Sequence, residues 1–235
     1  MALQHDSAHR DEAEAEIYLN FVDSLFADRR GMLIGLVLQI GIALCVYLES
    51  RLLIMGIWPA VFIIIAGYRY LHILGYSGEV AQSASLDQEA RLRWARKWEH
   101  RYILSSGAAG LAVGLFAWCS LELVGSDFAI ILALSTVFAA LPTIVGRLYG
   151  SVRLAAVLTV LSIAAPAASL AAKGTLQSTI ALILLLPYIA LVLGMVRRVR
   201  VTVVSAVRGR LEKAELAERF DVALNNMSHG VIMFD

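Results

Sequence analysis

Six long runs of apolar residues occupy most of this sequence and constrain what it can fold into. They lie at residues 31–48, 52–71, 102–124, 128–145, 154–172 and 176–196. A helix needs about 20 mainly apolar residues to cross the hydrocarbon core of a bilayer, where it satisfies its own backbone hydrogen bonds. The sequence therefore predicts six transmembrane helices.

The composition agrees with this prediction and excludes several other classes of protein. Hydrophobic residues make up 59% of the chain and charged residues 17%, whereas a soluble domain has about half and about a quarter. The mean hydropathy is +0.73. A net charge of +1 provides no bulk positive charge for binding nucleic acid, and two cysteines cannot form a disulfide-rich secreted scaffold.

Three very short connections predict how the helices pair. Residues 49–51, 125–127 and 173–175 leave only three residues between neighbouring runs. Helices joined by so short a turn lie side by side and antiparallel. We therefore expect an all-α integral membrane protein, in which six transmembrane helices form three antiparallel hairpins within residues 31–196.

The distribution of basic residues predicts the orientation of these helices. If the N-terminus is cytoplasmic, only Arg51 and Lys173 of the 20 Lys and Arg residues lie on outer turns, and the remaining 18 lie inside. Lys and Arg are enriched in cytoplasmic loops. We therefore expect both termini in the cytoplasm.

Pairs of glycines indicate where helices approach closely. Gly31 and Gly35 in the first run, and Gly110 and Gly114 in the third, are four residues apart. Residues four apart share one helix face, and small side chains there allow a second helix to come close. We expect both pairs to lie at helix contacts.

The cytoplasmic N-terminus, residues 1–30, contains an amphipathic stretch at 11–28. Ile17, Phe21 and Leu25 recur there at helical spacing. We expect a helix that lies on the inner membrane surface and continues into the first span.

The longest loop, residues 72–101, has a second amphipathic stretch. Trp94 and Trp98 share one face with Tyr102, and basic residues cover the other faces. Such a helix suits a position among anionic headgroups. Simple anchoring is the preferred interpretation, and regulatory lipid binding is the alternative.

Beyond the sixth run, residues 197–218 are charged and predict a cytoplasmic helix. Apolar residues recur along it at steps of three and four, as in a coiled-coil seam with a stutter. We expect a signalling helix that forms a parallel homodimer; a lone helix packed on the membrane or on the next domain is the alternative. The residues expected to couple the signal along this seam are Val203, Val207, Leu211 and Ala214.

The last segment, residues 219–235, predicts a short helix that stops at Gly230 and a strand that starts at Val231. One helix and one strand cannot enclose a core. We therefore expect this segment to be the start of an incomplete domain, and the chain to be a fragment of a longer polypeptide.

The same segment resembles the entry of a PAS domain, in the residues Ala223-Leu224-Asn225-Asn226-Met227, Gly230 and Phe234-Asp235. In particular, it is similar to the PAS domain that follows a membrane sensor in bacterial GGDEF–EAL cyclic-di-GMP proteins. The LFADRR stretch at 25–30, the six runs and the linker resemble the MASE-like membrane sensor of those proteins. The resemblance implies a location in the bacterial inner membrane and a diguanylate cyclase or phosphodiesterase output.

A second resemblance supports an alternative function. Asn226-Met227-Ser228-His229 is similar to the start of the phospho-acceptor box of sensor histidine kinases. In that box an acidic residue follows the histidine, whereas Gly230 follows it here. We therefore do not expect His229 to be a phospho-acceptor, but the input module of a histidine kinase remains the alternative.

Residues that would indicate catalysis are missing from the sequence. There is no GxSxG, HExxH, CxxC or Walker motif, so we expect neither enzymatic activity nor a bound cofactor within this chain. Charged residues inside membrane spans mark transport paths. Here they are limited to Arg69 and Glu122, near run ends, where their side chains can reach the interface. A small transporter is therefore the less favoured alternative.

Two further pairs of residues have both a functional and a structural interpretation. His72 and His100, at the inner ends of neighbouring runs, are candidate ligands for a metal or haem, although interfacial side chains are the preferred interpretation. Cys45 and Cys119, in the outer parts of their runs, would form a redox-sensitive disulfide or pack in apolar surroundings; we prefer packing.

The expected function is that of a sensory input module that couples a membrane or periplasmic cue to a cytoplasmic PAS and cyclic-di-GMP output. The expected partners are the bilayer, a second copy of the chain and an output domain in the same polypeptide, without nucleic acid. Because the outer turns are so short, any sensor pocket must lie among the helices, which favours a lipid-like molecule, a small hydrophobic ligand or the state of the bilayer itself as the cue.

The predicted topology can be tested with reporter fusions. A phosphatase that folds only in the periplasm should be active when fused after Gly174 and inactive when fused after residue 218. Activity at both positions, or the reverse pattern, would contradict the orientation inferred from the basic residues.

Overall fold

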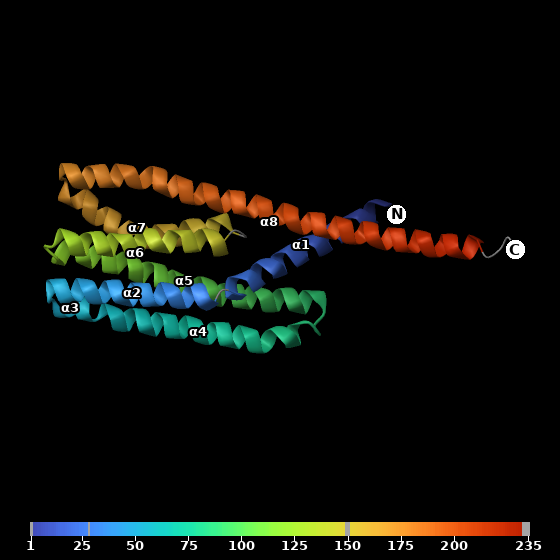
Figure 1. The fold of residues 1–235 in the computed structure, drawn as a ribbon, viewed down its shortest axis with the longest axis horizontal. Helices are drawn as coiled ribbons and strands as arrows, with labels where there is room; N and C mark the ends of the chain where they lie inside the picture. The colour runs from blue at the N-terminus through green and yellow to red at the C-terminus, as the bar shows by residue number, and fades with distance from the viewer. Residues whose placement is uncertain (1, 28, 149–150, 232–235) are drawn as a thin grey trace.

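The computed structural model describes residues 2–27, 29–148 and 151–231, and all elements in these ranges are α-helices (Figure 1). Eight helices are described: α1 (Ala2–Ala27), α2 (Arg29–Ser50), α3 (Leu53–Gly56), α4 (Trp58–Ser83), α5 (Gln88–Leu123), α6 (Asp127–Arg147), α7 (Val152–Lys173) and α8 (Leu176–Val231). The all-α prediction is therefore confirmed over the described part of the chain.

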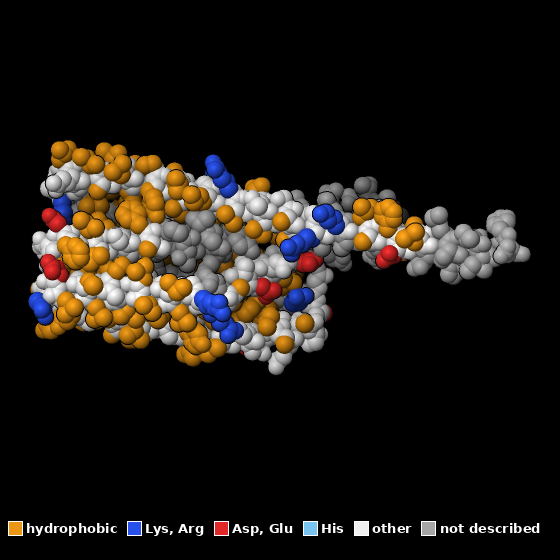
Figure 2. Space-filling model, viewed as in Figure 1, with side chains coloured by type: hydrophobic (Ala, Val, Ile, Leu, Met, Phe, Trp, Pro, Cys, Tyr) orange, Lys and Arg blue, Asp and Glu red, His pale blue; other side chains and the backbone are white. Residues whose placement is uncertain are grey.

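Five helical segments are long and apolar enough to cross a membrane, which agrees with a multi-pass membrane protein. They are Arg29–Ser50, Leu53–Ser83, Gln88–Leu123, Leu154–Lys173 and Leu176–Val207. The remaining predicted span falls on α6, whose described apolar portion, Asp127–Ala139, is shorter. Figure 2 shows apolar side chains along the flank of the bundle, with charged side chains towards its two ends.

Several large apolar side chains on the outside of the bundle would be costly to expose to water. Ile34 and Val37 on α2 are each 70% exposed, and Ile64 on α4 is 69% exposed. A large continuous apolar surface of this kind is rare on soluble proteins and matches the hydrocarbon core of a bilayer.

α5 lies at the centre of the bundle and contacts α1, α4, α6 and α7. Two buried clusters form around it. In the first, named the Phe116 cluster, Phe116 of α5 packs edge to face on Phe62 of α4. In the second, named the Trp98 cluster, Trp98 of α5 is grouped with buried side chains of α1, α2, α4, α7 and α8 and with Leu148.

The contact between α5 and α7 is close enough to require glycine. A Cβ atom at Gly114 would lie 2.8 Å from the backbone oxygen of Leu161 and 2.9 Å from that of Ser162. A Cβ atom at Gly110 would lie 2.9 Å from Ser162 Oγ. The predicted role of the Gly110 and Gly114 pair in helix contact is therefore confirmed.

The helix predicted in the second half of residues 72–101 is confirmed, and the first half is helical as well, to Ser83. α4 continues to Ser83 and α5 begins at Gln88, so only residues 84–87 form the turn. We call the extended helix ends, residues 72–83 and 88–101, the α4–α5 arm; it projects beyond the end of α2 (Figure 1). Trp98 is 2% exposed in this arm. The prediction that its face lies among lipid headgroups is wrong at Trp98, because the indole packs between helices.

The amphipathic stretch near the N-terminus also packs on protein. On α1, Val22 and Leu25 are each 1% exposed, and Phe26 is 4% exposed. These side chains belong to the Trp98 cluster, and α1 runs from the arm towards α8 (Figure 1). The apolar spacing predicted the helix correctly, but its buried face contacts other helices of this chain and not the membrane surface.

α8 is a single helix from Leu176 to Val231 that includes Pro187. It continues through Gly230, so the predicted helix stop at Gly230 and the start of a strand at Val231 are wrong. A strand needs a neighbouring strand for its backbone hydrogen bonds, and none occurs among residues 2–27, 29–148 and 151–231, whereas a helix forms these bonds internally. The rest of the predicted strand, residues 232–234, lies outside the described residues.

The α5–α7 contact gives a stability prediction with a matched control. Gly114→Ala should destabilise the fold by about 1–3 kcal/mol, because its Cβ atom meets rigid backbone. Gly67→Ala on α4 should be neutral or slightly stabilising, because nothing lies within 4 Å of its Cβ position. Thermal unfolding in detergent measures both variants, and equal midpoints would contradict the close contact.

Candidate functional site

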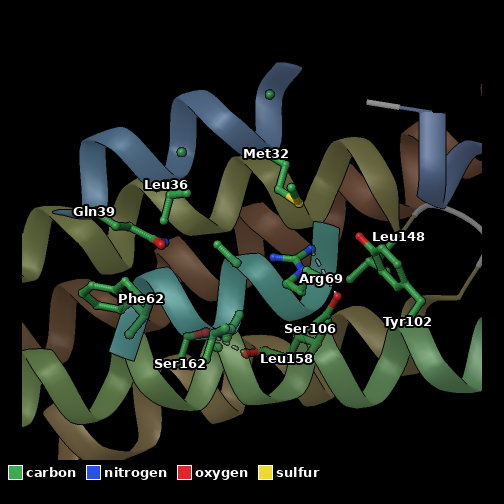
Figure 3. A pocket seen from close by; sticks show the side chains of 17 residues that line it. Met32, Leu36, Gln39, Phe62, Arg69, Tyr102, Ser106, Leu148, Leu158 and Ser162 are labelled. Carbon is green, nitrogen blue, oxygen red and sulfur yellow. Dashed lines mark hydrogen bonds between the residues drawn. The ribbon is translucent and has the colours of Figure 1, made fainter. Parts of the chain in front are cut away.

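A cavity of about 120 Å³ lies inside the bundle, between α2, α4, α5 and α7 (Figure 3). The labelled side chains that line it are Met32, Leu36 and Gln39 of α2, Phe62 and Arg69 of α4, Tyr102 and Ser106 of α5, Leu158 and Ser162 of α7, and Leu148 after α6. Most of the lining is apolar, and a few polar groups converge from different helices. This kind of lining occurs at sites that bind small molecules, but the volume is below the roughly 300–1,000 Å³ of drug-sized sites.

Small residues create the space for this cavity. Gly31 and Gly35 of α2, Ala66 of α4, and Ala109 and Gly110 of α5 all line it. A Cβ atom at Gly35 would have no atom within 4 Å, so the expected close helix contact at Gly35 is wrong. α2 packs mainly against α4 and α6, and its glycine face borders the cavity.

Arg69 is the one charged side chain among the described lining residues. It is half-buried, and its Nη2 donates a hydrogen bond to Ser106 Oγ (3.4 Å). The guanidinium carbon also lies 5.8 Å from the ring centroid of Tyr102, within cation–π range.

The inward position of Arg69 corrects the sequence interpretation. We expected its side chain to extend to the interface, but it points into the cavity (Figure 3). Sequence reasoning missed this because distance from the end of an apolar run does not tell which way a side chain faces. The available signal was a charge inside a run, together with small residues on the helices around it.

Tyr102 connects the cavity to the Trp98 cluster. Its ring is 5.5 Å from that of Phe26 of α1, in an edge-to-face arrangement. Phe26 in turn stacks on Tyr76 of α4 at 4.1 Å and meets Trp98 edge to face at 5.8 Å. One ring of α1 therefore contacts aromatic side chains of both α4 and α5 beside the cavity.

Hydrogen bonds to carboxylates join the helices at the periphery of this aromatic cluster. Trp94 Nε1 and Trp98 Nε1 both donate to Glu79 Oε2 at 3.1 Å, which joins α4 to α5. The hydroxyl of Tyr76 donates to Asp23 and so joins α4 to α1. These bonds satisfy the polar ends of aromatic rings that are otherwise packed in apolar surroundings.

A further bond joins α1 to α5. The Tyr18 hydroxyl donates to a carboxylate oxygen of Glu99, and burial together with this bond raises the pKa of Tyr18 above its usual value. Tyr18 therefore stays neutral and remains a donor over the physiological pH range.

The same cluster includes a residue in the middle of α8, at the point where this helix leaves the bundle. Val196 of α8 is fully buried in the Trp98 cluster, together with Leu154 and Leu158 of α7. Leu158 also lines the cavity. The cavity and the point where α8 leaves the bundle therefore share packed side chains.

The predicted coupling residues lie on the part of α8 beyond Val196. Val203 and Val207 are partly buried. Leu211 and Ala214 are in the same helix, but their side chains lie outside the described residues. Their role in coupling stays a prediction.

The candidate metal ligands have different surroundings. The ring of His72 packs against Tyr68 at 4.3 Å and Trp98 at 6.4 Å, whereas His100 is exposed on α5. Over the part of the chain that the structure describes, no group of three His, Cys, Asp or Glu side chains is placed to hold a metal ion. Cys45 is exposed, Cys119 is buried, and both are free thiols.

Comparison of the chain with models of protein families, with curated proteins and with solved structures gives no match.

The aromatic junction gives a prediction about α1. Phe26→Ala should cost about 3 kcal/mol or more, because it removes a ring that contacts Tyr76, Trp98 and Tyr102. Phe220→Ala on α8, where the ring is 63% exposed, is the control and should change little. Limited proteolysis should cut the Phe26→Ala variant faster within α1; equal cleavage of both variants would contradict the packing role.

Proposed function

We propose that this chain is a membrane-embedded sensory input module, which passes the state of its helix bundle through α8 to an output domain of the same polypeptide. The observation that supports this most directly is α8, a continuous helix of 56 residues that begins as an apolar span and ends as a charged helix outside the bundle. At a rise of about 1.5 Å per residue it extends about 84 Å.

The proposed topology has six spans in three hairpins, with both termini in the cytoplasm of a bacterial inner membrane. The length of α6, 21 residues, supports a sixth span, since about 20 residues cross the bilayer. The distribution of Lys and Arg supports the orientation.

The proposed mechanism starts with a change of packing around the cavity. Tyr102 and Leu158 line the cavity and belong to the Trp98 cluster, which also contains Val196 of α8. A different packing of this cluster would shift or rotate α8 at Val196. A ligand can drive such a change only through different affinities for the two arrangements.

The proposed output is reached through a dimer of the signalling helix. A seam of apolar residues from Val199 through Val203 and Val207 would pair with the same seam of a second copy. By the resemblance of residues 25–30 and 219–235, the next domain would be a PAS domain followed by a cyclic-di-GMP synthesising or degrading domain. The input module of a histidine kinase is the alternative with the same helix arrangement.

A small transporter is a second candidate, because Arg69 faces a cavity within the bundle. Charged groups in that position occur in substrate pathways. Uptake by sealed vesicles that contain the protein separates the two functions: a sensor gives no accumulation of solute, whereas a transporter does.

The coupling role of α8 predicts a dependence on helical phase. With the chain fused to a cyclase domain, one residue inserted after Ser205 would rotate everything beyond it by about 100° and should change cyclase output. A seven-residue insertion restores the phase to within about 20° and should leave output close to that of the parent fusion. Identical output from all three fusions would contradict signalling through this helix.

A further inference from the structure

We infer that α1 and a second copy of the chain compete for the same face of α8, so that α1 keeps α8 unpaired until α1 is displaced. The inference rests on the proposed function for the dimer itself, whereas the contact between α1 and α8 can be measured separately. Three observations support it: the burial pattern along α8, the position of α1, and the charges of the two helices.

The face of α8 that packs in the bundle continues beyond the bundle. Val196 is fully buried. Val199, Val203 and Val207 follow it at steps of three and four residues, so they lie on the same side of the helix. All three are partly buried, whereas Val201, on another side of the helix, is 68% exposed. The proposed dimer seam is therefore turned towards the rest of this chain.

α1 lies next to this part of α8. The two helices are in contact, and Figure 1 shows α1 beside α8 beyond the ends of α6 and α7. Val196 belongs to the Trp98 cluster together with Phe21 of α1. α1 leads into α2 whereas α8 leaves the bundle, so the two helices run in opposite directions here. The residues that precede Phe21 are therefore placed towards the part of α8 that follows Val196.

The charges of the two helices favour this contact over a dimer. Residues 6–16 of α1 include five acidic residues and one arginine. Residues 197–213 of α8 include six basic residues and one acidic residue. Opposite charges attract α1 to α8, whereas two copies of the same basic stretch repel one another when their helices pair. The electrostatic energy therefore favours α1 as the occupant of this face.

The Trp98 cluster determines how firmly α1 is held. Phe26 packs against Trp98 and Tyr102 of α5. The Tyr18 hydroxyl donates a hydrogen bond to Glu99, also on α5. Only one residue separates α1 from α2, so α1 is tied directly to the bundle. A rearrangement of the bundle that loosens this cluster would therefore free α1 from α8 and uncover the seam.

The contact of α1 with α8 is tested by cysteine alkylation of the complete chain. Cys45 and Cys119 are first replaced by Ser and Ala, and either Val207→Cys or Val201→Cys is introduced. In nanodiscs that hold one copy each, N-ethylmaleimide should react about five-fold more slowly with the Val207→Cys variant, because α1 must open first. Equal rates would show that α1 leaves this face open and would overturn the inference.

Charge reversal on α1 tests the electrostatic contribution without changing a buried cluster. Glu14 is exposed, and Glu14→Lys should speed alkylation of the Val207→Cys variant about three-fold, because it replaces attraction to α8 by repulsion. Glu89→Lys, at an exposed glutamate of the α4–α5 arm, makes the same charge change and is the control. Equal effects of both charge reversals would contradict an electrostatic hold by α1.

Phe26→Ala tests the dependence on the Trp98 cluster. It should speed alkylation of the Val207→Cys variant at least about ten-fold, because α1 then opens more often. Tyr18→Phe keeps its ring but loses the bond to α5, and should give a smaller increase of about three-fold. This milder variant decides the question if Phe26→Ala fails to fold, as judged by size-exclusion chromatography. Unchanged rates would overturn the inference.

Competition with a second copy is tested by cross-linking in nanodiscs that hold two copies. Bismaleimidoethane should join two Val207→Cys chains faster when Glu14→Lys or Phe26→Ala is also present. Raising the salt from about 0.01 M to about 1 M shortens the Debye length from about 30 Å to about 3 Å and should also increase cross-linking, because it screens both the attraction of α1 and the repulsion between copies. Equally fast cross-linking with and without these changes would show that α1 does not exclude a second copy.

The failures of the two proposals are distinguishable. Slow alkylation that the α1 variants relieve, without cross-linking in any variant, would contradict the dimer of the proposed function and with it the competition, although the contact of α1 with α8 would stand. Cross-linking of all variants at equal rates, with equal alkylation at positions 201 and 207, would leave the dimer intact and overturn the role of α1.

Discussion

Burial of aromatic rings around Trp98 is the interaction on which the arrangement of α1, the α4–α5 arm and α8 depends. Phe26 packs against Tyr76, Trp98 and Tyr102, so α1 is fixed to the α4–α5 arm. The cluster also includes Val196, where α8 leaves the bundle. Stacked and edge-to-face aromatic pairs each contribute about 0.5–1.5 kcal/mol beyond the burial of their surface. The arm and α1 therefore form a packed unit at the end of the bundle from which α8 emerges.

Within the bundle, glycine residues determine how closely the helices pack, and the cavity is one consequence. α5 and α7 approach so closely at Gly114 that a Cβ atom has no room. On the other side of the cavity, Gly35 faces open space. Glycine thus allows close contact where a second backbone is present, and it leaves a void where none is. Arg69 lies within that void, beside Tyr102, so a group that is rare in membrane spans is located where the bundle meets the Trp98 cluster.

Helix positions were predictable to a useful degree, but helix surroundings were not. The spacing of Phe21 and Leu25 correctly indicated an amphipathic helix, and Trp94, Trp98 and Tyr102 correctly indicated a shared face. Both faces were assigned to lipid and found on protein, because a pattern of apolar residues shows that a face is buried without showing what buries it. Arg69 illustrates the same limit, since its place in the sequence is equally compatible with the interface and with the interior.

The sequence by itself determined that this chain is helical and built for a bilayer, because backbone groups in lipid must bond within each helix and long apolar runs meet that need locally. It also determined that Gly110 and Gly114 permit a close helix contact. Only the tertiary structure decided that α7 makes this contact, that the helices at 72–83 and 88–101 pack together as an arm, and that Arg69 faces a cavity. These features depend on which helices become neighbours, and side chains far apart in the chain settle that through their combined packing.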